Sequence, residues 1–192
     1  MTLLIAGIIL FLGTHMIRVV APDFRSAMIA KIGESGWKGL YAAASLLTLA
    51  ILIYGYAKAP VIDLYFPPAG MAHLALTLML FAMIFLVAGM LPAGHIATKS
   101  KHPMVLSIKI WAFSHLLANG DLASVLLFGS FLAWGVLIRI ALKRRQRAGE
   151  LVLRPFVSAR NDILAVVIGA AVWLVFIWKL HELLIGVPPI VM

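Results

Sequence analysis

Cysteine is absent from the chain, which excludes disulfide bonds, thiolate metal sites and cysteine nucleophiles. Acidic residues are scarce as well, with seven Asp and Glu against 16 Lys and Arg in 192 residues. Charged residues make up 12% of the chain, about half of their share in soluble domains, whereas apolar residues make up 64%. This composition predicts an integral membrane protein. Its basic excess is better explained by cytoplasmic loops than by a nucleic-acid partner.

Proline, glycine and charged residues divide the chain into apolar segments that are predicted to be membrane helices. A segment of about 20 residues at 1.5 Å per residue matches a hydrocarbon core of about 30 Å. The fold is therefore predicted to be all-α, a polytopic transmembrane helical bundle of about six spans in a single domain, residues 1–192. The predicted spans are residues 2–20, 37–57, 71–91, 103–118, 122–142 and 162–185.

The connections between these spans carry most of the polar residues. Residues 23–36 are predicted to form a polar connection that includes an interfacial helix, and residues 58–70 and 92–102 to form loops. The fourth span, residues 103–118, is only about 24 Å long and therefore too short for a full crossing. The Asn-Gly-Asp sequence that follows it predicts a turn shielded from lipid, in which Asp121 caps or turns the chain.

The distribution of basic residues predicts the orientation in the membrane. Six spans place both termini on one side. Thirteen of the 16 Lys and Arg fall in the first, third and fifth connections or at their edges, against Lys58 and Lys179 on the opposite side. Under the positive-inside rule the termini should face outward, which is the periplasm for a bacterial inner (cytoplasmic) membrane.

The segment at residues 101–121 (KHPMVLSIKIWAFSHLLANGD) has polar residues at regular spacing. On a helix, residues four apart lie on one face, and here that face carries Ser107, Trp111, His115 and Asn119. A polar stripe on an otherwise apolar helix is expected to face a partner or a cofactor rather than lipid.

Histidines are the only plausible transition-metal ligands in this cysteine-free chain, and the candidates His15, His73 and His115 lie on three different predicted spans. Ionisable residues inside a membrane are candidates for function, although a single histidine on a helix more often packs than binds metal. By depth, His73 and His115 lie toward the outer leaflet and His15 toward the inner one, so depth favours the pair of His73 and His115. His181, beside Glu182, is expected to be a helix end that needs no function.

Several stretches together resemble the NnrU family of bacterial membrane proteins. This family is associated with denitrification, through the expression of nitrite and nitric oxide reductase activity. It is also distantly similar to 15-cis-zeta-carotene isomerase, a membrane haem b protein whose ligand set changes with redox state. The stretches that carry the resemblance are His15-x-x-Arg18, APDFR at 21–25, IGESGWKGLYAAASL at 32–46, Gly55-Tyr56-x-x-Ala59, His73 and the whole 101–121 segment.

The resemblance implies a haem b cofactor whose iron is ligated by His15 and His115, with His73 opening a span. Depth favours His73 instead of His15, so the second ligand remains open. Where the family has Arg-His-Pro, this chain has Lys-His-Pro at residues 101–103. Because the chain has no cysteine, a cysteine thiolate cannot serve as an iron ligand that is exchanged when the redox state changes. Further residues expected to line the cofactor are Arg18, Trp111 and Asn119.

Three functions are compatible with these patterns. The first is a haem-binding membrane protein of NnrU type with a redox or nitric-oxide-related role in denitrification. The second is a haem-dependent isomerase or oxidoreductase acting on an apolar, lipid-like (carotenoid-like) substrate. The third is a cofactor-free small transporter or assembly factor. The expected partners are the lipid bilayer and a small apolar ligand or nitric oxide, and no residue is assigned a catalytic role.

Overall fold

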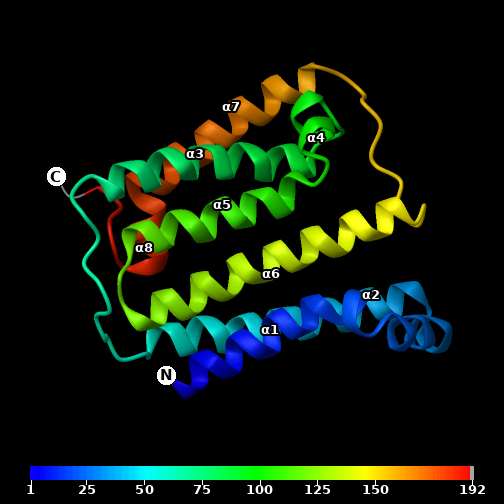
Figure 1. Cartoon of the computed structure of the whole chain (residues 1–192), viewed down its shortest axis with the longest axis horizontal. Coiled ribbons are helices and arrows are strands. Elements are labelled where there is room, and N and C mark those ends of the chain that lie inside the picture. Colours follow the sequence, from blue (N-terminus) through cyan, green and yellow to red (C-terminus); the bar gives the residue numbers. More distant parts are fainter. Residues whose placement is uncertain (191–192) are drawn as a thin grey trace. The chain divides into compact units, whose positions relative to one another are not determined.

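A computed structural model describes residues 1–190, and over this range it is built from helices without a β-strand (Figure 1). Within the described residues, five helices are long and apolar enough to cross a membrane, and a sixth apolar helix, α5, is shorter. The predicted all-α membrane fold with a short fourth span is therefore confirmed. The elements are α1 (Thr2–Val20), α2 (Pro22–Ala57), α3 (Met71–Met90), α4 (His95–Ser100), α5 (Pro103–Ala118), α6 (Leu122–Arg147), α7 (Arg160–Val175), the π-helical turn η1 (Phe176–Leu180) and α8 (His181–Ile185).

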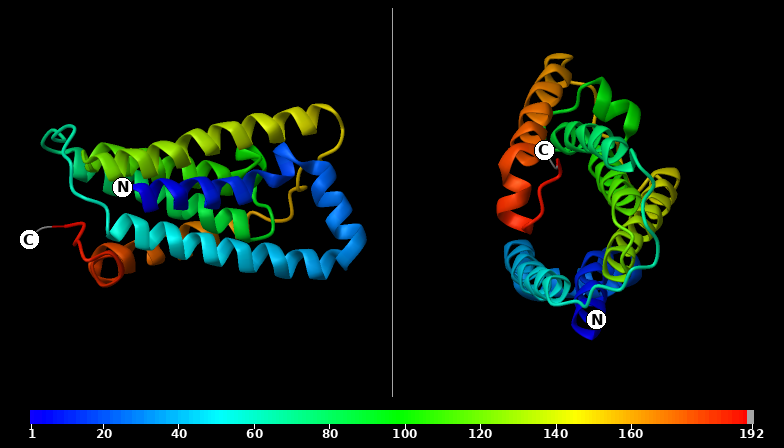
Figure 2. Two further views of the ribbon diagram at one scale, coloured as in Figure 1. Left: turned by 90° about the horizontal axis from the view of Figure 1, so that it is seen from below. Right: turned by 90° about the vertical axis from the view of Figure 1, so that its left-hand side faces the viewer.

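Proline sets the start of two of these helices. Pro22 opens α2 and Pro103 opens α5, each in the first turn, where the missing N–H has no partner to lose. The bounds of α1 and α5 are those predicted from the sequence. The connection at residues 23–36 is helical and continuous with α2, which bends at Gly33 (φ 76°, ψ 167°), a conformation that favours glycine. Figure 2 (left) shows the bend, with the first turns of α2 steeply inclined to the rest.

The contacts group the described chain into two compact units. The first unit comprises Met1–Leu64 and Asp121–Ser130, and the second comprises Tyr65–Gly120 and the chain from Phe131 onwards. The expectation of a single domain stays a prediction.

In the first unit, α1 and α2 pack closely through two glycines. A Cβ atom at Gly7 would lie 2.5 Å from the Cα of Leu52, and one at Gly55 would lie 2.7 Å from the backbone N of Leu4. Leu4 and Leu52 are themselves buried. Small residues let membrane helices approach backbone to backbone, so these glycines set the spacing of the pair.

The start of α6 belongs to the first unit and is capped as the sequence predicts. Asp121 Oδ1 accepts a hydrogen bond of 2.9 Å from the backbone N–H of Ser124, which satisfies one of the free donors at this helix end. The Ser124 hydroxyl is in turn hydrogen-bonded to the Tyr56 hydroxyl at 2.8 Å.

In the second unit, α3 packs against both α5 and α7. The buried hydroxyl of Ser107 on α5 donates to the Ala82 carbonyl of α3 at 2.7 Å, and Trp173 Nε1 of α7 donates to the Leu76 carbonyl at 3.0 Å. Gly169 of α7 lies so close to Ile84 of α3 that a Cβ there would be 2.8 Å from the Ile84 Cα. Two interhelical hydrogen bonds and one close glycine contact therefore fix α3 between its neighbours.

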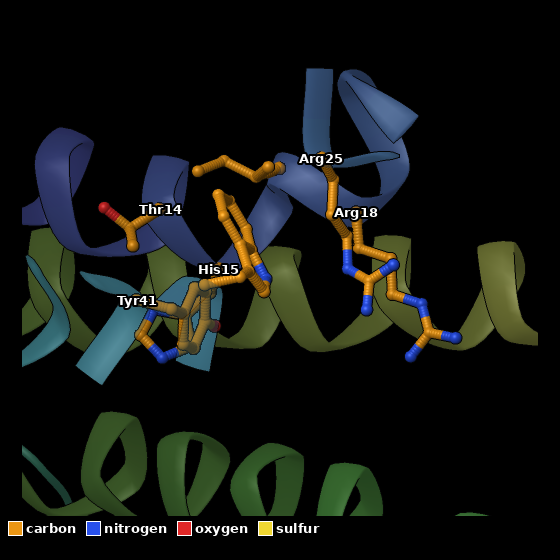
Figure 3. Close-up of a pocket in the computed structure, with 7 residues that line it drawn as sticks. Thr14, His15, Arg18, Arg25 and Tyr41 are labelled. Atoms are coloured by element: carbon orange, nitrogen blue, oxygen red, sulfur yellow. The ribbon is translucent and has the colours of Figure 1, made fainter. Parts of the chain in front are cut away.

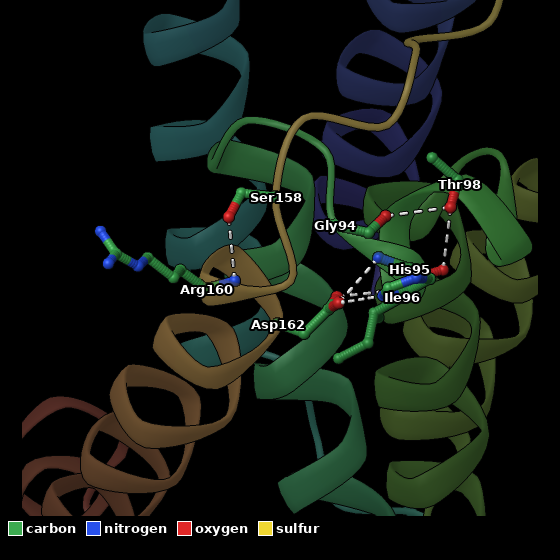
Figure 4. A network of polar contacts seen from close by, with 7 residues as sticks. All are labelled: Gly94, His95, Ile96, Thr98, Ser158, Arg160 and Asp162. Atoms are coloured by element: carbon green, nitrogen blue, oxygen red, sulfur yellow. Dashed lines mark hydrogen bonds and ion pairs between the residues drawn. The ribbon is translucent and has the colours of Figure 1, made fainter.

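Helix α4 lies in a segment predicted to be a loop, and a distant carboxylate stabilises it. Asp162 of α7 accepts hydrogen bonds from the backbone N–H groups of His95 and Ile96, both at 2.8 Å, and contacts His95 Nδ1 at 3.0 Å (Figure 4). Gly94 makes room for this contact, because a Cβ there would clash with the Asp162 carboxylate. Residues 92–102 were predicted to form a loop, and this prediction is wrong for His95–Ser100, which form a short helix.

Candidate functional site

The structure gives the residues of the polar stripe on α5 different roles. Ser107 is committed to helix packing by its hydrogen bond to α3. The Trp111 ring lies edge-on to the Phe131 ring of α6, with ring centres 5.3 Å apart, and tilted against the His115 ring at 5.4 Å. The Asn119 side chain donates to the His115 carbonyl at 2.8 Å and so caps the end of α5. Trp111 and His115 are therefore the two members of the stripe whose rings pack against other rings.

The orientation of the His115 ring is fixed by its own helix. Its Nδ1 lies 2.8 Å from the Trp111 carbonyl oxygen. A carbonyl only accepts hydrogen bonds, so Nδ1 carries the proton, and in the neutral ring the lone pair is on Nε2. Imidazoles that bind metal are commonly held in this way, with one nitrogen bonded to a carbonyl and the other bearing the lone pair.

A second histidine, His181, lies directly beside His115. The two ring centres are 6.5 Å apart and the ring planes are inclined by 23°. His181 Nδ1 lies 2.7 Å from the Val187 carbonyl oxygen, so the same reasoning places its lone pair on Nε2. Two helices of the second unit, α5 and α8, thus supply a pair of imidazoles with matching tautomers.

In the first unit, His15 and Arg18 line one cavity of about 290 Å³ (Figure 3). His15 Nδ1 lies 2.8 Å from the Phe11 carbonyl oxygen, and its ring is edge-on to Tyr41 at 5.6 Å. Arg25 joins Arg18 in the lining, so α1 and α2 each contribute a guanidinium group. His15 therefore has the same Nδ1 anchor as His115, within a basic and aromatic cavity.

His73 is differently placed from the other two candidates. It lies in the first turn of α3 and is exposed, and its carbonyl accepts a hydrogen bond from the Thr77 hydroxyl at 3.0 Å. His73 and His115 belong to the second unit and His15 to the first, and the roles expected for all three stay predictions.

At the N-terminal end of α5, His102 lies in the short connection outside the membrane-spanning helices. Its Nε2 atom is buried and has no hydrogen-bond partner within residues 1–190. Burial, together with the nearby positive charges of Arg139, Lys101 and Arg154, lowers the pKa of His102 below its ordinary value of 6.5. The neutral form is therefore favoured at this position.

No group of three or more His, Asp or Glu side chains converges on a metal-ion position within the described part of the chain. A haem iron already has four porphyrin nitrogens and takes at most two axial ligands from the protein. Two histidines, His115 and His181, are therefore enough to ligate a haem iron, although they would be too few for a bare metal ion.

Two residues of these sites were not singled out by the sequence. His181 was assigned to a helix end, and the only local signal was a histidine near the end of the predicted span 162–185. Arg25 is part of the APDFR stretch but shows no periodic relation to Arg18. Both are brought into place by tertiary structure: His181 by the course of α7, η1 and α8, and Arg25 by the turn between α1 and α2.

Fold and site together define an all-helical integral membrane protein with an anchored histidine pair on its helices. A family model described as NnrU protein matches residues 3–189, which is nearly the whole chain, and the chain therefore belongs to the NnrU family. The comparisons give no match among curated proteins or among solved structures.

Proposed function

We propose that this NnrU-family protein binds haem b through His115 and has a redox or nitric-oxide-related role linked to denitrification. The observation that carries the proposal is the pairing of His115 with His181 at a ring separation of 6.5 Å, each ring anchored through Nδ1. Neutral imidazoles with a lone pair on Nε2 are the usual protein ligands of haem iron in electron-transfer and sensing sites.

The separation of the two rings suits a shared metal. An imidazole nitrogen lies about 2 Å from a metal that it binds. Two imidazoles on opposite sides of one metal therefore have ring centres about 6 Å apart, because each centre lies about 1 Å behind its nitrogen. The observed 6.5 Å is close to this value. His181 is for this reason the partner that we prefer for His115, whereas the family resemblance implies His15.

The chain's own residues would hold the cofactor and set its surroundings. His115 and His181 would supply the nitrogens that hold the cofactor, the Trp111 ring lies next to His115, and the Phe131 ring packs against Trp111. Haem in such a place supplies one-electron redox chemistry, or nitric oxide binding where an axial position opens. The apolar helix surface would exclude water and so favour a stable low-spin complex over exchange with solvent.

We further propose that the protein resides in the bacterial cytoplasmic membrane with both termini in the periplasm. The support is the asymmetry of charge, because thirteen of the 16 basic residues belong to the three connections assigned to the cytoplasm. Cysteine residues introduced at Thr2 and at Arg147 test this assignment in the cysteine-free chain. A membrane-impermeant thiol reagent applied to intact spheroplasts should label position 2 and not position 147.

An absorption spectrum tests the haem proposal. Protein purified from haem-sufficient cells should show a Soret band, and the pyridine haemochrome of the extract should identify haem b. His115→Ala should lose the band, whereas His95→Ala, which alters a histidine hydrogen-bonded to Asp162, should keep it. A colourless wild-type protein, or an unchanged spectrum in His115→Ala with the helicity retained, would contradict the proposal.

A further inference from the structure

His102 and Arg139, both in the second unit, each have a buried side-chain nitrogen with no hydrogen-bond partner within residues 1–190. The atoms are Nε2 of His102, at the N-cap position of α5, and Nη1 of Arg139, in the second half of α6. Buried polar groups in proteins are nearly always hydrogen-bonded, because an unbonded one has lost its water without compensation. Both nitrogens are therefore expected to bind a polar group.

The packing of α5 against α6 places the arginine opposite the start of α5. The Trp111 ring of α5 packs against the Phe131 ring of α6. Two residues earlier on α5 and four residues later on α6, a Cβ at Gly135 would lie 2.6 Å from Cγ of Lys109. The two helices are thus antiparallel here. One further turn along α6 leads to Arg139, which therefore lies level with the N-terminal end of α5.

The electrostatics of His102 agree with this register. Among the charges that lower the pKa of His102, that of Arg139 has the largest effect, ahead of those of Lys101 and Arg154. Such an effect grows as the distance between two groups shrinks. Nη1 of an arginine only donates hydrogen bonds, and neutral histidine donates as well in the tautomer with its proton on Nε2. The two side chains can therefore share one acceptor.

The carboxylates of the second unit are already bonded elsewhere. Over residues 65–120 and 131–190 the sequence has three acidic residues. Asp162 accepts the backbone N–H groups at the start of α4, Glu150 lies 3.3 Å from Arg145, and Glu182 lies 2.7 Å from Lys179. An anionic acceptor for the two nitrogens therefore comes from outside this unit.

We propose that His102 and Arg139 bind a phosphate group, carried either by an anionic phospholipid or by a soluble phosphate. The planar guanidinium of arginine matches the geometry of phosphate oxygens, and a histidine N–H adds a further donor. The start of α5 lies on the predicted cytoplasmic side, where basic pockets between membrane helices are suited to phospholipid head groups. The site does not include His115, so it is independent of the haem proposal.

The test is a binding titration on the full-length protein in detergent after removal of co-purified lipid. Phosphatidylglycerol is added, and the bound lipid is counted by native mass spectrometry. The wild-type protein should bind it at least ten times more tightly than Arg139→Gln, and His102→Ala should also bind it more weakly. The matched control is Arg144→Gln, which removes the same charge from an exposed residue of the same helix and should bind as the wild type does.

Two comparisons identify the bound group and its source. Diacylglycerol with the same acyl chains lacks the phosphate, so the wild-type protein and Arg139→Gln should bind it equally. Inorganic phosphate is then added at constant ionic strength while phosphatidylglycerol is bound. Displacement at millimolar concentration identifies a soluble phosphate as a ligand, and retention of the lipid identifies the head group. Both results support a phosphate site, provided that Arg139→Gln has lost it.

Three results would overturn the proposal. The first is equal binding of phosphatidylglycerol by the wild-type protein and Arg139→Gln. The second is an equal loss in Arg144→Gln, which would show that net charge alone governs binding. The third is a loss of diacylglycerol binding in Arg139→Gln, which would show that the phosphate is not the group recognised. If Arg139→Gln does not fold, Arg139→Lys replaces it. This variant keeps the charge but not the planar guanidinium and should bind phosphatidylglycerol more weakly than the wild type.

Discussion

The rings of His115 and His181 lie 6.5 Å apart, and each is held by a hydrogen bond from Nδ1 to a backbone carbonyl. The carbonyls belong to Trp111 and Val187, so the main chain sets the direction of both rings. A substitution of one histidine should therefore leave the other ring correctly oriented. The role of each histidine can therefore be tested by substituting one of them at a time.

With haem held by His115 and His181 as proposed, replacing His181 with glycine should convert a six-coordinate low-spin haem into a five-coordinate high-spin haem without loss of the cofactor. The reason is that His115 remains as the proximal ligand while the opposite position is emptied. Imidazole added at millimolar concentration should enter the vacated space and restore the low-spin signal. Absorption and electron paramagnetic resonance spectra measure both changes.

The matched variants are His15→Gly and His73→Gly, which should leave the low-spin signal unchanged. If His15→Gly instead gives the high-spin spectrum and the imidazole rescue, the second ligand is His15, as the family resemblance implies, and the role proposed for His181 is wrong. Binding through His115 would still stand in that case.

Gly7→Ala should destabilise the protein by about 1–3 kcal/mol, the usual cost of overpacking. Its new Cβ would lie 2.5 Å from the Cα of Leu52, so the backbones of α1 and α2 must separate. Gly13→Ala, in the same helix, is the control, because its Cβ meets nothing within 4 Å. Reversible unfolding in mixed micelles should show the loss only for Gly7→Ala, and equal effects of the two substitutions would refute this account.

Asp162→Ala should lower the stability by about 1–2 kcal/mol, because it removes the cap of α4. Two backbone N–H groups, those of His95 and Ile96, would lose their acceptor. Asp162→Asn keeps one oxygen acceptor and should lose less. Thermal unfolding in detergent gives the difference, and hydrogen exchange at His95 and Ile96 should accelerate in the alanine variant. Unchanged exchange there would contradict the capping role.

The stability of the protein should fall as the pH is lowered through about 6.5. Because the pKa of His102 is lowered in the folded protein, the unfolded chain binds more protons between that pKa and 6.5. The unfolding free energy therefore rises with pH across this window. Above the window His102 is neutral in both states and no longer contributes to the pH dependence. The contribution of one residue cannot exceed about 1.4 kcal/mol per pH unit. His102→Gln should remove this part of the slope, and an identical slope in the variant would argue against it.

The sequence predicted the membrane helices well where local signals mark their ends. Both bounds of α1 and α5 agree with the predictions, whereas α2 begins at Pro22 and not at residue 37, where the second span was predicted to start. The helix α6 continues beyond the predicted end to Arg147, because lysine and arginine favour helix once the chain has left the apolar region. Charge marks where the apolar segment ends and not where the helix does.

Features that depend on contacts between distant residues were not predictable in this way. Helix α4 has only six residues, and its cap comes from Asp162, which no local pattern connects with it. The nearness of His181 to His115 depends on the course of the last helices, and a sequence window around His181 contains only an unremarkable helix end. The anchor of His115 is different, since a histidine can reach the carbonyl four residues before it on any helix.

The π-helical turn at Phe176–Leu180 lies immediately before His181. Such a turn accommodates an extra residue within a helix. If the same residues were wound as an ordinary α-helix, everything that follows would be rotated by about 100° around the helix axis. The direction of His181 around the helix axis thus depends on the π-helical turn, and a change that converted this turn to α-helical winding at constant length would direct a different side chain toward His115.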